Sequence, residues 1–249
     1  MNTGKKICWL YLIAFCGLTG CAAVGPPLPT VDWNTTEDAR TILTERQNAI
    51  ESVQTQVKIR YTSPPPESET NTFDGALVIA TNDRFRLRTW KINQTIFDLT
   101  VTPEGTFIAA IDEMKERTPD SEADLAALAN NLGAMLRGPD YAEARIETRG
   151  DTVRLFWGPN ARPELAAEFD RWTLGLRAIR TRTANGSTPV AVESQQADYN
   201  GYVWFKELTA AGDFGRFEMT FRDVEINGEL NPRAFKPPRR AVRLERPLP

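Results

Sequence analysis

Alternation of apolar and polar residues with a period of two is the feature of this chain that most restricts its fold. In residues 84–88, Phe85 and Leu87 alternate with arginines, so a strand there would have one apolar face and one polar face. Similar runs recur along the chain, separated by short turn signals. About eleven or twelve short strands are therefore predicted, which favours an antiparallel barrel or sandwich. The predicted strands are residues 53–61, 73–80, 84–90, 95–101, 106–112, 144–148, 152–157, 172–181, 190–199, 202–208, 214–226 and 242–244.

Two segments with helical spacing interrupt these strands. Thr35 followed by Asp38 is typical of a capping box, and apolar residues then follow a helical stripe as far as Val53. A second helix is predicted to begin near Ser121 and to stop at Gly138, with leucines along one face. The predicted fold class is therefore mainly β (α+β), with two amphipathic helices covering part of one apolar face of the sheet.

The N-terminus is typical of an export signal. Two lysines precede an apolar run over residues 7–15, which is too short to span a bilayer. The run closes with LTGC at residues 18–21, which closely resembles the bacterial lipobox. We therefore expect a signal peptide over residues 1–20, a lipidated Cys21 with its tether over residues 21–34, and one domain over residues 35–249. The alternatives are an ordinary secretory signal or a membrane anchor.

The distribution of cysteines supports lipidation. Cys8 and Cys16 lie inside the predicted signal, so Cys21 would be the one thiol of the mature chain, and no internal disulfide could form. We expect a covalent N-acyl diacylglycerol on Cys21 and no other cofactor, and this group would hold the protein permanently on membrane lipid. Because Ala22 and not aspartate follows the cysteine, the expected location is the outer membrane, with the domain facing the periplasm.

Charge and composition exclude several classes of function. Removing the two signal lysines from the 30 basic residues leaves 28 against 33 acidic ones, a net charge of −5, so nucleic acid is not an expected partner. The chain has no histidine, and no serine lies in a Gly-x-Ser-x-Gly turn, which excludes triad chemistry and imidazole metal sites. Asp112, Glu113 and Glu116 could offer oxygen ligands, but a solvated loop is the better interpretation, and no metal is predicted. No enzyme is predicted either; a hydrolase with paired carboxylates stays as a third alternative.

The order of these elements resembles the LolA/LolB lipoprotein-carrier superfamily. The similarity is clearest at residues 83–88 (DRFRLR) with 94–99 (QTIFDL), and at residues 223–230 (DVEINGEL) leading to 235–238 (FKPP). This resemblance implies an incomplete antiparallel β-barrel whose concave apolar side is covered by helices and forms a cavity for acyl chains. It also implies non-covalent binding of lipid or lipoprotein acyl chains.

Particular residues are assigned to this cavity by the resemblance, although each could equally form a closed core. In LolB an exposed leucine of the hairpin between this strand pair aids the insertion of cargo into the membrane. By the resemblance Ile92 would hold that position here, without the Pro-Leu-Gly pattern of the family. The rival hypothesis is a periplasm-facing structural or interaction lipoprotein with a filled core that contacts envelope proteins. The cavity candidates are Phe85, Leu87, Trp90, Phe97, Leu99, Phe107, Ile111, Trp172 and Leu174.

Overall fold

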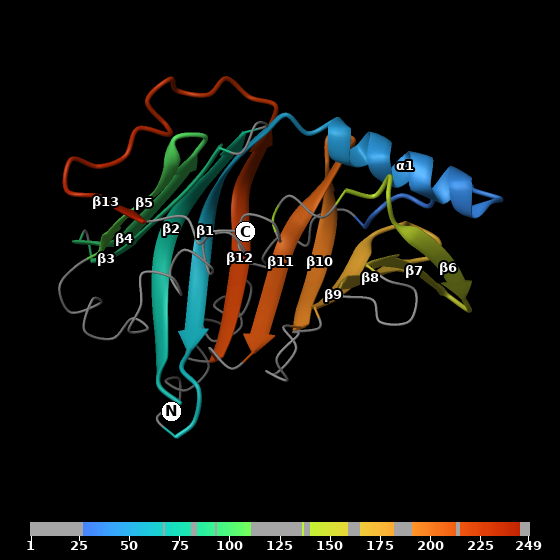
Figure 1. Cartoon of the computed structure of the whole chain (residues 1–249), viewed down its shortest axis with the longest axis horizontal. Helices are drawn as coiled ribbons and strands as arrows, with labels where there is room; N and C mark the ends of the chain where they lie inside the picture. The colour runs from blue at the N-terminus through green and yellow to red at the C-terminus, as the bar shows by residue number, and fades with distance from the viewer. Residues whose placement is uncertain are drawn as a thin grey trace, which may run out of the picture.

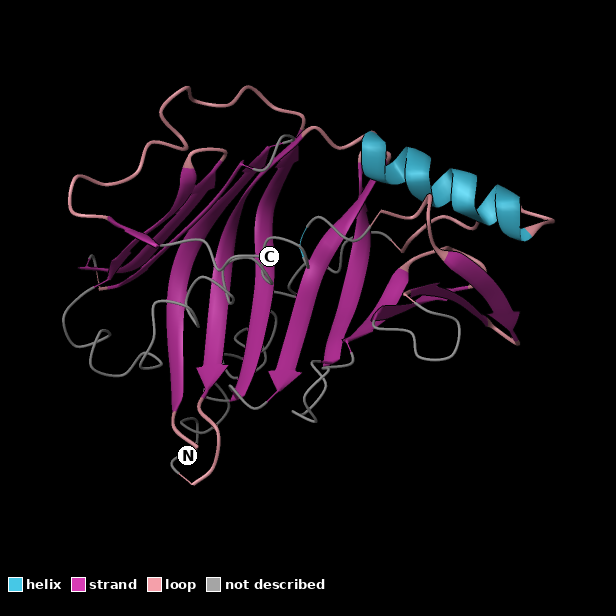
Figure 2. Ribbon diagram, in the orientation of Figure 1, coloured by secondary structure: helices cyan, strands magenta, loops and turns pink. Residues whose placement is uncertain are grey.

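The fold is dominated by one large antiparallel sheet (Figures 1 and 2). The computed structural model describes residues 27–66, 68–80, 84–92, 94–110, 136, 140–158, 165–181, 191–212 and 215–244. In these ranges the sheet has 13 strands, in the order β13-β5-β4-β3-β2-β1-β12-β11-β10-β9-β8-β7-β6. The strands are β1 Ser52–Thr62, β2 Thr70–Ala80, β3 Arg84–Lys91, β4 Gln94–Thr102, β5 Gly105–Ala110, β6 Arg145–Arg149, β7 Thr152–Trp157, β8 Leu165–Asp170, β9 Leu176–Thr181, β10 Ala191–Tyr199, β11 Tyr202–Gly212, β12 Gly215–Ile226 and β13 Val242–Leu244.

The sheet is curved and open, with β13 and β6 as its two edges. Strands β1 to β5 extend in sequence order toward one edge, whereas β6 to β12 return from the other edge until β12 pairs with β1. The prediction of a mainly β fold with an open antiparallel sheet is therefore confirmed. Among the described residues, no helix has both the length and the apolar content needed to cross a bilayer.

Helix α1 (Thr36–Asn48) begins with the predicted capping box. The Thr35 hydroxyl accepts the Asp38 backbone N–H at 3.1 Å, and the Asp38 carboxylate accepts the Thr35 N–H at 2.8 Å. The helix buries Ala39 and Leu43 and runs along one end of the sheet, beside β10 to β6 (Figure 1). The predicted covering of the concave face by helices is not evident among the described residues. The predicted second helix falls outside the described residues, except for the helical Leu136, which is buried in the core.

The predicted extension of the first helix to Val53 is wrong, because the side chain of Asn227 holds the chain open after α1. Its amide nitrogen donates to the Ala49 carbonyl at 2.7 Å, and its oxygen accepts the Glu51 N–H, also at 2.7 Å. These bonds satisfy backbone groups that a longer helix would have used. Strand β1 can then begin at Ser52.

The predicted strand over residues 172–181 is confirmed from Leu176 onward but is wrong before it, where the chain forms a turn. Strand β8, which was not predicted, ends at Asp170, and β9 begins at Leu176 and pairs with it. The Asp170 carboxylate accepts the N–H groups of Trp172 and Thr173, and Leu174 has a positive φ of 49°, so the backbone reverses direction. Two alanines weaken the strand pattern of β8, since alanine is depleted in strands.

The concave face of the sheet carries most of the core, but the outer face is partly buried as well. On the outer face of β4, Asp98 and Thr100 are 2% and 0% exposed. Arg86 pairs with Asp98 and also donates to the Ala234 carbonyl at 3.0 Å, so the C-terminal segment lies over this part of the sheet. The alternation predicts a polar, solvated outer face, and at β4 this face is instead buried.

Candidate functional site

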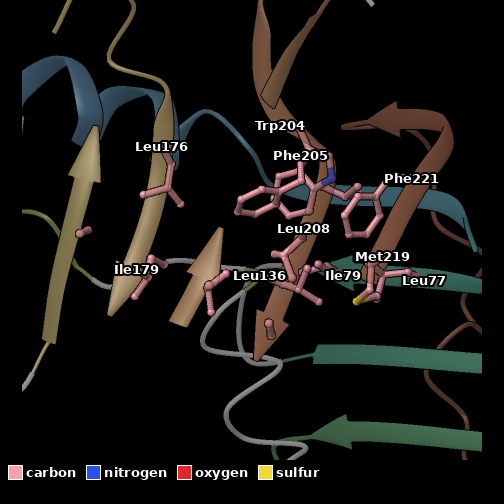
Figure 3. Packing of buried hydrophobic residues seen from close by; sticks show 14 of the residues in the cluster. Leu77, Ile79, Leu136, Leu176, Ile179, Trp204, Phe205, Leu208, Met219 and Phe221 are labelled. Atoms are coloured by element: carbon pink, nitrogen blue, oxygen red, sulfur yellow. The ribbon is translucent and has the colours of Figure 1, made fainter. Parts of the chain in front are cut away.

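A cavity of about 380 Å³ lies between α1 and the concave face of the sheet. Its wall combines apolar side chains from elements that are far apart in the sequence, and Figure 3 shows several of them converging from β2, β9 and β11. This volume lies at the lower end of the range of about 300–1,000 Å³ that is typical of small-molecule sites. The lining residues are Leu43, Arg46, Gln47, Asn48, Ile50, Glu51, Ser52, Val53, Ile79, Ala80, Leu136, Tyr141, Phe169, Leu174, Leu176, Gln196, Val203, Trp204 and Phe205.

The apolar part of the wall is tightly supported by aromatic packing. Tyr141 contacts Phe169 edge-on, with their ring centroids 5.7 Å apart, and Trp204 contacts Phe205 in the same way at 5.0 Å. Burial raises the pKa of the Tyr141 hydroxyl, so this group is neutral at neutral pH. The wall therefore offers apolar surface and neutral rings to a ligand.

A few polar groups complete the wall. Arg46, near the C-terminal end of α1, donates to the Thr173 carbonyl at 2.7 Å. Burial lowers the pKa of Arg46 and the charge of Asp198 opposes this shift, but the guanidinium stays charged. The indole nitrogen of Trp204 is buried and has no hydrogen-bond acceptor among the described residues. Arg46 therefore places a cation beside the apolar surface of the cavity.

The described lining of the cavity carries few acidic groups. Within the described ranges, histidine, cysteine, aspartate and glutamate nowhere gather in a group of three that could hold a metal ion. Glu51 is the one carboxylate among the described lining residues, so they do not bring two acids together. An apolar ligand could be held here by burial of its surface.

Comparison of whole structures identifies the fold. A candidate outer-membrane lipoprotein-sorting protein domain from Vibrio parahaemolyticus superposes with a TM-score of 0.51 at 11% identity, covering 81% of this chain and 97% of that one. A LolA superfamily protein from Nitrosomonas europaea gives 0.51 at 9% identity, covering 79% and 96%. This chain has a LolA-like fold. No family model and no curated protein sequence matches it.

Several predicted cavity residues lie in the packed part of the LolA-like sheet. Phe85, Leu87 and Leu99 are 2–4% exposed in the core, and Phe97 is half-buried against it. These four residues share the concave face but do not line the cavity. Leu174 does line it, from the turn between β8 and β9.

Three other cavity assignments are wrong. Trp172 is 62% exposed, because it lies in the turn after β8 and not in a strand. Phe107 pairs with Thr100, which places it on the outer face, while its neighbour Ile108 takes the inner one. Trp90 follows a register shift in β3 and lines a separate cavity of about 180 Å³ beside Asp74. The remaining candidate, Ile111, lies outside the described residues.

The hairpin between β3 and β4 presents Ile92 to solvent. This residue is 91% exposed and has a positive φ of 47°. Exposure of a large apolar residue at a hairpin tip is compatible with contact to membrane or cargo, and that role stays a prediction.

The sequence patterns missed the residues that make most of the cavity. Leu43 belonged to the predicted helical stripe, but nothing in the stripe shows which strands it meets. Trp204 and Phe205 are adjacent and both buried, whereas strict alternation would bury only one of them on the concave face. The one sequence feature that could have indicated these cavity residues was this aromatic pair inside a predicted strand.

The turn after β8 should lose stability in acid. Burial of the Asp170 carboxylate acts to raise its pKa, but hydrogen bonds from Thr173 and Trp172 and the charge of Arg177 outweigh it, so the pKa lies below the ordinary 3.8. The stabilisation is therefore complete above the ordinary value and is lost as the pH falls through the folded-state pKa.

An Asp170→Ala variant tests this turn. At neutral pH the variant should lose about 1.5–3 kcal/mol of unfolding free energy, as expected for hydrogen bonds to a charged group. The difference from the wild type should shrink in acid, where the carboxylate of the wild type is protonated. Urea unfolding at a series of pH values measures both quantities, and a difference that is independent of pH would contradict this account.

Proposed function

We propose that this protein is an outer-membrane lipoprotein, anchored through an acylated Cys21, that binds acyl chains of lipids or lipoproteins without making or breaking a bond. The observation that carries the proposal is the apolar cavity between α1 and the sheet of a LolA-like fold. The neighbour from Vibrio parahaemolyticus is described as a candidate outer-membrane lipoprotein-sorting domain, which supports an envelope location and a lipidated cargo.

The cavity can supply the required binding energy from burial alone. Each methylene that leaves water for an apolar wall contributes about 0.8 kcal/mol. Seating a chain would require α1 to move, and α1 is held mainly by the buried Ala39 and Leu43 and by hydrogen bonds from Arg40 and Arg46. An entering acyl chain would replace the contacts of Leu43, so the net loss of buried area would be small.

Native mass spectrometry of the protein purified from membranes tests the proposal. We expect a non-covalent mass of one acyl-chain lipid that delipidation of the purified protein removes and added palmitate restores. Denaturing the sample would separate this mass from the covalent acyl group on Cys21. A chain that stays empty through palmitate titration would contradict the carrier function.

The second candidate function is an interaction module, and the free edge of β6 is the observation that favours it. Strand β6 pairs only with β7 among the described residues, which leaves one edge for a partner strand. The edge carries Arg145, Glu147 and Arg149, however, and charges of this kind disfavour edge pairing. An empty domain that co-purifies with one envelope protein would support this function instead.

A further inference from the structure

Two tryptophans and an arginine form an unusual surface cluster at the turn between β8 and β9. Trp172 is 62% exposed, and the guanidinium carbon of Arg171 lies 5.7 Å from the ring centroids of both Trp172 and Trp33. We call these three residues the Trp33 cluster. Trp33 donates from its indole nitrogen to the Arg171 carbonyl at 2.8 Å, and Arg171 donates to the Gly150 carbonyl at 3.1 Å.

The turn fixes Trp172 in its exposed position. The Asp170 carboxylate accepts three hydrogen bonds from Trp172 and Thr173, at 2.9–3.0 Å. On the other side Leu174 is 1% exposed in the core. The turn thus holds a large aromatic ring outside the core, next to the half-buried ring of Trp33.

The N-terminal segment leaves the domain at this same turn. The Val31 N–H donates to the Trp172 carbonyl at 2.8 Å. Leu28 packs so closely that a Cβ on Gly175 would lie 2.5 Å from its Cδ1. Cys21 precedes Pro27 by six residues, and a fully extended chain reaches at most about 3.6 Å per residue, or roughly 20 Å. A lipid on Cys21 would therefore keep the cluster near the bilayer.

The cavity lies beside the same turn. Leu174 forms part of its wall, and Arg46 of α1 donates to the carbonyls of Thr173 and Leu174 at 2.7 and 3.4 Å. The N-terminal segment, the Trp33 cluster and the cavity are thus joined by a stretch of four residues, from Arg171 to Leu174.

We propose that the Trp33 cluster is the surface through which the domain rests on the bilayer, with the cavity beside the lipid. This inference depends on the anchor at Cys21, which belongs to the proposed function. Tryptophan is favoured at the boundary between lipid and water, and an arginine can lay its stem on apolar surface while its charge stays in water.

The charges around the Trp33 cluster indicate which kind of bilayer it fits. Arg177 is paired with Asp170 and Asp151, and the nearby Asp32 is exposed. Arg171 therefore adds little net positive charge to its surroundings. The partner is then the interfacial zone of a zwitterionic bilayer, held by the indole rings, and the contact should not weaken as salt is raised.

The Ile92 hairpin offers a different orientation. Arg84, at the start of β3, pairs with Ala80 on the cavity wall, while Ile92 follows the other end of this strand of 8 residues. At about 3.3 Å per residue the two ends are roughly 25 Å apart. Contact through the hairpin and contact through the Trp33 cluster therefore involve regions at opposite ends of the strands.

Quenching of tryptophan emission distinguishes the two orientations. The full chain, purified with its acyl group, is reconstituted in phosphatidylcholine vesicles that carry bromine atoms near the headgroups. We expect quenching that is unchanged by salt, and we expect Trp172→Phe to remove most of it. Trp90→Phe is the matched control, because Trp90 lies next to the Ile92 hairpin and far from the cluster.

Two results would overturn the proposal. Trp172→Phe could leave the quenching unchanged, or Trp90→Phe could remove it, which would place the Ile92 hairpin at the membrane. The intact mass of the protein shows separately whether Cys21 carries acyl groups. A mass without them would contradict the proposed lipidation but not the membrane contact of Trp172. Adding the same brominated vesicles to that unacylated chain would still decide whether Trp172 contacts lipid.

Discussion

An Ile50→Trp variant is expected to bind a palmitoyl chain about 100-fold more weakly than the wild type. Ile50 is half-buried on the cavity wall, between α1 and β1. The larger indole would occupy space that three or four methylenes of the ligand need. At about 0.8 kcal/mol for each methylene, the loss is about 2.5–3 kcal/mol, which corresponds to this change in affinity.

The chain offers a matched control in Ile146. This isoleucine is also half-buried against the main core, but it lies on β6 and does not line the cavity. Ile146→Trp should therefore keep the affinity of the wild type in a titration with a fluorescent palmitate. Equal losses in the two variants would indicate general damage to the core, and an unchanged affinity in Ile50→Trp would place the ligand elsewhere.

Local patterns predicted the elements whose neighbours along the chain decide their structure. The capping box at Thr35 and the alternation of Phe85 and Leu87 both depend on residues within one turn or one strand, and both are present. The pattern failed where one side chain redirected the backbone. Asp170 turns the chain inside a predicted strand, and this reverses the environment expected for Trp172.

The cavity could not be predicted in the same way. Its wall brings Leu43 of α1 together with Phe169 of β8, Leu176 of β9 and Phe205 of β11. These contacts depend on the strand order, which places β12 beside β1 and returns the second half of the chain toward α1. The alternation shows that a residue faces inward, but it cannot show whether that interior is packed or hollow.

Among the substitutions discussed, Asp98→Ala should produce the largest loss of unfolding free energy, about 3–5 kcal/mol. The carboxylate is 2% exposed on the outer face of β4. It accepts two bonds from the guanidinium of Arg86, at 2.7 and 2.9 Å. Asp98→Ala would leave that guanidinium partly buried with the Ala234 carbonyl as its one remaining acceptor among the described residues. Urea unfolding measures the loss.

The size of this loss would come from the charge left behind, and a double variant can show it. Replacing both partners, with Arg86→Met and Asp98→Leu, should restore most of the stability, because no buried charge then lacks a partner. Two ion pairs nearer the surface provide the comparison. Glu218, which is 34% exposed, contacts Arg60 and Arg216, and Glu218→Ala should cost less than about 1 kcal/mol. If the double variant were as unstable as Asp98→Ala, the pair itself would stabilise the sheet, and the C-terminal segment over β4 would depend on it.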